Sequence, residues 1–77
     1  LMRLSVELPD TPGSLARLTA ILAEKKTNIM QIFHNRLDTK LPLGKALVEL
    51  NLETRGPDHV EEIMEALKKE DYLARLL

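Results

Sequence analysis

Two runs of alternating apolar and polar residues constrain the fold of this chain most strongly. In residues 2–8 every second side chain is apolar, and the same pattern returns in residues 46–53. Alternation with a period of two residues is typical of strands that bury one face and expose the other. Because each run has a polar face, we expect an antiparallel sheet whose helices cover only one side.

The first alternating run leads through a short turn into an amphipathic segment. Its apolar stripe consists of Leu15, Leu18 and Leu22. Asp10 or Thr11 can cap a helix here, and Pro12 suits the first helical position. Lys25 and Lys26 favour the carbonyl end, where cations interact well with the helix dipole. We therefore expect a helix from Pro12 to Lys25 or Lys26.

A second amphipathic segment follows residues 46–53. Its stripe consists of Val60, Ile63, Met64 and Leu67. Pro57 suits the first position of a helix, Asp58 suits its first turn, and Lys68 and Lys69 suit its end. This pattern predicts a second helix that begins near Pro57.

Two weaker strands complete the pattern. Residues 28–37 alternate imperfectly, which indicates a bulge or a strong twist, and residues 72–77 form a short final strand. Pro42 and Gly44 mark residues 38–45 as a loop. The order β-α-β-β-α-β predicts an α+β, ferredoxin-like sandwich: one domain over residues 1–77, with a four-stranded antiparallel sheet and two helices on one face. Its second and fourth strands lie at the sheet edges, where they invite pairing with another copy.

Composition excludes several classes of function. The chain has 77 residues, 11 basic and 12 acidic side chains, a net charge of −1 and no cysteine. This balance gives no electrostatic footprint for nucleic acid, and residues 2–8 and 46–52 lack the aromatics of a base-stacking sheet. Without cysteine there is no thiolate nucleophile or sulfur-ligated metal, and His34 and His59 have no neighbouring ligand cluster. We expect a cytoplasmic domain, excised from a longer chain, with no catalytic residue, cofactor or metal of its own.

The segment "LPDTPGSLARL", residues 8–18, can form half of a small-molecule site. A helix that begins near Pro12 leaves the N–H groups of Gly13, Ser14 and Leu15 unpaired, and these donors favour a carboxylate. Asp10 can accept hydrogen bonds from an ammonium group. The two charges together suit an α-amino acid. The alternative is that the segment is simply a well-formed turn, and that Asn28 is a turn residue after a helix.

The segment "LPDTPGSLARLTAILAEKKTNIMQI", residues 8–32, resembles the signature of the ACT domain family, and the expected order of elements fits that family along nearly the whole chain. More narrowly, residues 3–18, residues 41–59 and Tyr72 are similar to the C-terminal ACT domains of single-ACT threonine ammonia-lyases (threonine dehydratases). The segment "ETRGPDH", residues 53–59, is the most specific part. The resemblance implies a regulatory module without catalytic residues. ACT domains pair side by side, and amino-acid effectors bind at their interface.

The resemblance also implies which residues bind an effector, here isoleucine or valine above all. The implied site consists of Asp10, Thr11, Pro12, Gly13, Ser14 and Leu15 of one domain, with Asn28, Ile29 and Gln31 of its partner. Some serine-binding relatives carry a histidine where Leu8 stands here, which weakens the case for serine. Pyridoxal phosphate is implied only for a separate catalytic domain of the parent enzyme. Two alternatives remain open: a ligand-silent domain that serves assembly, and an ACT domain of another enzyme of amino-acid metabolism.

Overall fold

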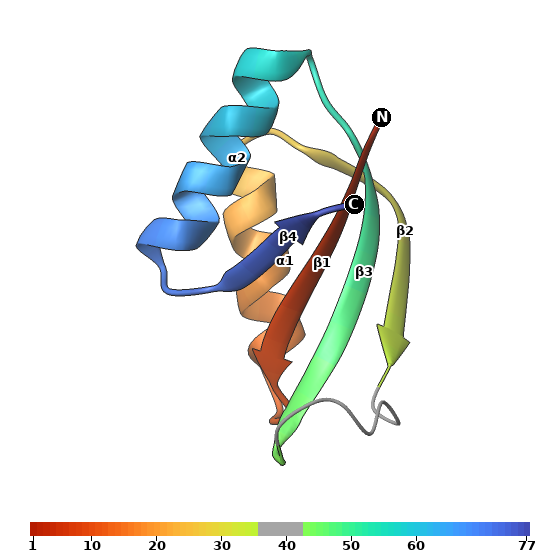
Figure 1. Cartoon of the computed structure of the whole chain (residues 1–77), viewed down its shortest axis with the longest axis vertical. Helices are drawn as coiled ribbons and strands as arrows, with labels where there is room; N and C mark the ends of the chain where they lie inside the picture. The colour runs from red at the N-terminus through yellow and green to blue at the C-terminus, as the bar shows by residue number, and fades with distance from the viewer. Residues whose placement is uncertain (36–42) are drawn as a thin grey trace.

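The predicted architecture is confirmed by the computed structural model, which describes residues 1–35 and 43–77 (Figure 1). Its elements are β1 (Met2–Pro9), α1 (Ser14–Glu24), β2 (Asn28–Asn35), β3 (Lys45–Glu53), α2 (Pro57–Lys69) and β4 (Leu73–Leu76). The strands form one antiparallel sheet in the order β2-β3-β1-β4, and both helices lie on one side of it. Residues 36–42, which include the end of the expected second strand and most of the expected loop, lie outside the described residues.

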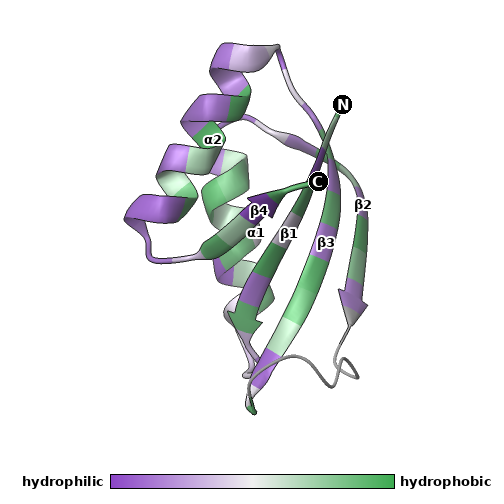
Figure 2. Cartoon of the chain, viewed as in Figure 1, coloured by the Kyte–Doolittle hydropathy of each residue, from purple (hydrophilic) through white to green (hydrophobic). Residues whose placement is uncertain are grey.

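The central ladder between β1 and β3 holds the core. It runs in unbroken register from Met2 opposite Leu52 to Pro9 opposite Lys45. The apolar faces of both strands therefore point together toward the helices. Figure 2 shows the apolar residues as green bands along both strands. Buried side chains from both strands and both helices complete the core; they are Met2, Leu4, Val6, Leu8, Leu18, Leu22, Val48, Leu50, Leu52, Ile63 and Leu67.

The edge strand β2 contains the expected irregularity. Ile29 lies opposite Leu52 and Gln31 lies opposite Asn51, so Met30 is the extra residue of a β-bulge. Beyond the bulge the strand resumes regular pairing with β3 as far as Asn35. Its outer edge has no neighbouring strand among the described residues, and Met30 and Phe33 are 52% and 54% exposed.

The start of α1 differs from the prediction. The helix begins at Ser14, its N-cap is Gly13, and no side chain caps it, so the expectation of a cap at Asp10 or Thr11 with Pro12 in the first position is wrong. The hydroxyl of Thr11 instead contacts that of Ser14 at 2.9 Å. The helix ends at Glu24, just before Lys25 at the C-cap. For α2, the prediction of Pro57 in the first turn and Lys68 and Lys69 in the last is confirmed.

His59 joins the two helices at their adjoining ends. Its side chain is only 4% exposed. The backbone N–H of Arg55 donates to Nδ1 at 3.0 Å, so Nδ1 carries no proton. The other ring nitrogen, Nε2, then carries the proton and donates to the carbonyl oxygen of Lys25 at 2.7 Å. One neutral imidazole therefore satisfies a donor before α2 and a carbonyl oxygen at the end of α1.

Replacing His59 with alanine should lower the free energy of unfolding by roughly 2–3 kcal/mol, because an N–H group and a carbonyl oxygen lose their partners at a partly buried position. Urea unfolding followed by circular dichroism measures this loss. The matched control is His34→Ala, which truncates an exposed side chain on β2 and should change stability by less than about 0.5 kcal/mol. Equal losses in the two variants would contradict a linking role for His59.

Candidate functional site

The turn after β1 is held in a defined shape at one end of the sheet. The backbone N–H of Asp10 donates to the carbonyl oxygen of Gly44 at 2.8 Å, which fixes the turn against the start of β3. Gly13 has a φ of +88°, in the left-handed region, and a β-carbon placed there would meet no atom within 4 Å. Backbone conformation, and not lack of space, is therefore the reason for glycine at this position.

The first turn of α1 presents a different set of N–H donors from the one expected. The N–H of Ser14 donates to the carbonyl oxygen of Thr11 at 3.3 Å, so the expectation that it is unpaired is wrong. Helix geometry provides no intrahelical acceptor for the N–H groups of Gly13, Leu15 and Ala16. These groups lie at the positive end of the helix dipole, which favours an anion such as a carboxylate.

A concave region of about 470 Å³ lies over this turn. Its volume falls within the range of about 300–1,000 Å³ that is usual for small-molecule sites. Its lining combines the end of β1, the turn, the first turn of α1 and one residue of β2; the residues are Leu8, Pro9, Asp10, Thr11, Pro12, Gly13, Ser14, Leu15, Ala16 and His34. The first half of the predicted site is thus brought together in one pocket.

Sequence reasoning did not place His34 in this pocket. The signal was present in the β-α-β connection, because β1 and β2 both pair antiparallel with β3 and so run parallel to each other. Strands that run parallel finish at the same end of a sheet. The last residues of β2 therefore lie near the turn that follows β1. His34 adds an imidazole to a pocket that is otherwise lined by the end of β1, the turn and the first turn of α1.

The second half of the predicted site lies at the other end of β2. The side-chain amide of Asn28 donates to Glu53 Oε1 at 3.4 Å, and Gln31 Oε1 accepts a 2.6 Å hydrogen bond from Asn51. Ile29 packs against the core. Asn28 is separated from His34 by about 20 Å of strand. The two halves of the predicted site therefore do not meet within one copy of the chain.

Other kinds of site find little support in the described part of the chain. Within residues 1–35 and 43–77, no group of three or more metal-binding side chains is placed to hold an ion. No helix there has the length and apolar character needed to cross a membrane. A larger concave region, of about 760 Å³, surrounds β4 and α2, away from the turn.

Comparison with known proteins identifies the family. The ACT domain family model matches residues 2–71, and the chain belongs to this family. It is 46% identical over 76 residues to L-threonine ammonia-lyase of Geobacter sulfurreducens, covering 99% of the chain and 19% of that protein. It is 43% identical over 68 residues to L-threonine ammonia-lyase of Thermotoga maritima, covering 88% of the chain and 17% of that protein. The chain therefore spans about a fifth of the length of these relatives.

A solved structure shows the same fold. Prephenate dehydratase from Streptococcus mutans superposes with a TM-score of 0.78 at 23% identity, covering 99% of this chain and 40% of that one. The ferredoxin-like arrangement deduced from the alternating runs is thus also the arrangement of this structure.

The left-handed conformation of Gly13 can be tested by substitution. Gly13→Ala should destabilise the domain by about 1–2 kcal/mol, because a β-carbon disfavours the left-handed backbone. Gly13→Asn should cost clearly less, since asparagine tolerates that conformation. Urea unfolding of the two variants measures the difference. Equal stability of the alanine variant and the wild type would contradict a fixed left-handed turn.

Proposed function

We propose that the chain is the regulatory, amino-acid-binding domain of a pyridoxal-phosphate-dependent threonine ammonia-lyase. Two relatives at 43% and 46% identity carry that enzyme name, and this chain corresponds to about a fifth of their length. In this proposal the cofactor and the lyase chemistry belong to another domain of the parent enzyme. This chain contributes no catalytic residue and acts only through binding.

The observation that carries the proposal is the pocket over the first turn of α1, with His34 at its side. Asn28 lies at the opposite end of the same edge strand. If two copies pair antiparallel along β2 about a two-fold axis, Asn28 of each copy comes to the His34 end of the other. The exposed side chains of Met30 and Phe33 provide apolar surface for such a pairing. The site is then completed by the partner.

The chemistry of this combined site suits a free amino acid. Unpaired N–H groups in the first turn of α1 attract the carboxylate, and the carboxylate of Asp10 attracts the ammonium group. The amide of Asn28 from the partner both donates and accepts hydrogen bonds. Leu15 and the partner's Ile29 offer apolar surface for a branched side chain. Isoleucine and valine are therefore the effectors we favour.

Regulation follows from the position of the site between two copies. An effector that contacts both copies binds better to one arrangement of the pair than to another. The difference in binding free energy between the two arrangements is what can shift the attached catalytic domains toward a more active or a less active state. A domain used only for assembly would keep the pairing edge but would have no ligand to bind.

Asn28→Ala should weaken effector binding by about tenfold or more, corresponding to roughly 1.4 kcal/mol, because the ligand loses a hydrogen-bonding amide. Stability should change little, since Asn28 is exposed. The measurement is an NMR titration of the chain with isoleucine, valine, threonine and serine, each in excess, following Gly13 to Ala16 and Asn28 to Gln31.

Glu53→Ala is the matched control for this titration. It removes the acceptor of the Asn28 amide within the chain and leaves the amide itself in place. This variant should bind the effector as the wild type does. If no amino acid shifts these signals in a folded, paired sample, the chain is an assembly domain and the proposal fails.

A further inference from the structure

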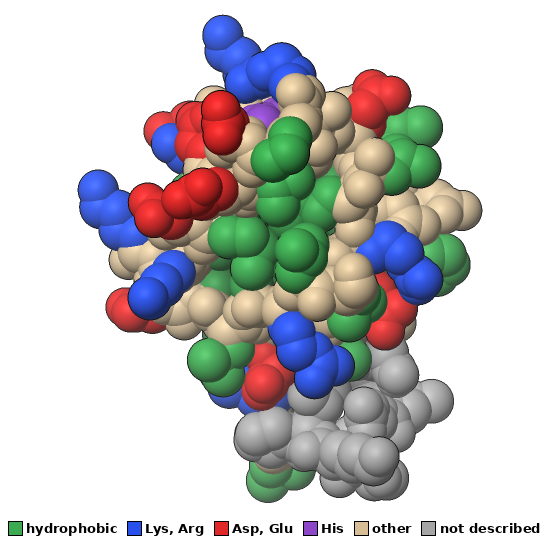
Figure 3. Space-filling view, turned by 45° about the horizontal axis from the view of Figure 1, so that its top comes forward, with side chains coloured by type: hydrophobic (Ala, Val, Ile, Leu, Met, Phe, Trp, Pro, Cys, Tyr) green, Lys and Arg blue, Asp and Glu red, His purple; other side chains and the backbone are tan. Residues whose placement is uncertain are grey.

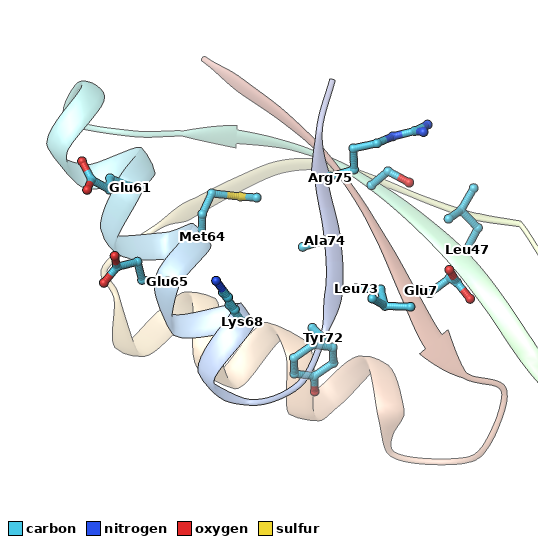
Figure 4. Close-up of a pocket in the computed structure, with 11 residues that line it drawn as sticks. Glu7, Leu47, Glu61, Met64, Glu65, Lys68, Tyr72, Leu73, Ala74 and Arg75 are labelled. Atoms are coloured by element: carbon cyan, nitrogen blue, oxygen red, sulfur yellow. The ribbon is translucent and has the colours of Figure 1, made fainter.

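A concave region of about 760 Å³ surrounds β4 and lies apart from the proposed effector site (Figure 4). Ala74 pairs with Val6 of the core, so it faces the helices, where Met64 extends toward it from α2. Leu73 and Arg75 lie on the other face of the sheet. The region therefore wraps around the free edge of β4 and includes one side of α2.

This edge leaves backbone and apolar surface uncovered. β4 pairs only with β1, so its outer side has no strand beside it in the described part of the chain. Leu73 is 70% exposed, and Leu76 and Leu77 are each 51% exposed. Hydrophobic side chains gather between α2 and the C-terminal strand in Figure 3, with charged side chains around them. An unpaired strand beside apolar surface is a common site of association.

The charges along α2 indicate what covers this surface. Glu61, Glu65 and Lys68 follow one another along the side of α2 that lines the region. None of them belongs to either ion pair found among the described residues, which are Arg3 with Glu49 and Lys25 with Glu62. The side is thus acidic toward the start of the helix and basic at its end.

Such a side is complementary to a second copy of itself turned end for end. A two-fold axis that passes between Met64 and Glu65 places Glu61 of each copy opposite Lys68 of the other, and Glu65 opposite Met64, because both pairs are centred on the same point of the helix. The same rotation makes the two β4 strands antiparallel. A parallel arrangement would instead set like charges against each other.

We propose that the α2–β4 edge is a second surface of self-association, at which two copies meet about a two-fold axis with Met64 near the centre and Glu61 of each copy against Lys68 of the other. This surface lies at the opposite edge of the sheet from β2. It shares no lining residue with the pocket of the proposed effector site. A chain with two different self-pairing edges can assemble beyond a dimer, into a tetramer or a longer array.

The test uses charge reversal in a Phe33→Lys background, where a lysine on β2 opposes pairing at the other edge. Glu61→Lys alone and Lys68→Glu alone should each weaken self-association by about tenfold or more, because each creates two like-charge pairs. An equimolar mixture of the two variants should associate again, since every pair in the mixed dimer is then opposite in sign. The double variant Glu61→Lys/Lys68→Glu should also associate.

Glu62→Lys and Lys69→Glu are the matched controls, because they make the same changes of charge one residue away, outside the lining of the region. They should leave self-association within about twofold of the background. Sedimentation velocity over a series of concentrations gives the dissociation constants. A monomeric background protein, single variants no weaker than the controls, or a mixture that fails to associate would each overturn the proposal.

Discussion

The ladder between β1 and β3 is the constraint on which the rest of the structure depends. Its unbroken register sets the buried apolar side chains of both strands on the helix side, and a shift by one residue would turn them to solvent. Burial of this face against Leu18, Leu22, Ile63 and Leu67 then fixes both helices. The position of the turn after β1, and so of the pocket, follows from the same register.

The parts of the structure with a regular period were predictable from the sequence. Alternation around Val48 predicted the start of β3 to within one residue, because a strand with one buried face requires an apolar side chain at every second position. The start of α1 was not predictable in the same way. Several residues between Asp10 and Gly13 suit the start of a helix. Because Gly13 adopts the left-handed conformation, the helix begins only at Ser14. The bulge at Met30 could be expected only as an irregularity.

The candidate site was only partly predictable, for a topological reason. The turn residues are adjacent in sequence and had to lie together. Asn28 had to lie far from them in the same copy, because β1 and β2 run parallel and Asn28 begins its strand. His34 lies near the turn for the same reason. The sequence therefore indicated a site in two halves. The structure places one half at the start of the edge strand β2 and the other beside the end of that strand.

The central claim is that antiparallel pairing along β2 joins these two halves. A spin label on Met30→Cys tests it directly, since the chain has no other cysteine. The labelled chain is mixed with an equal amount of unlabelled, ¹⁵N-enriched chain, so that only contacts between copies are detected. The account predicts that the amide signals of His34 and of Gly13 to Ala16 broaden. Broadening confined to other residues, or none in a paired sample, would contradict it.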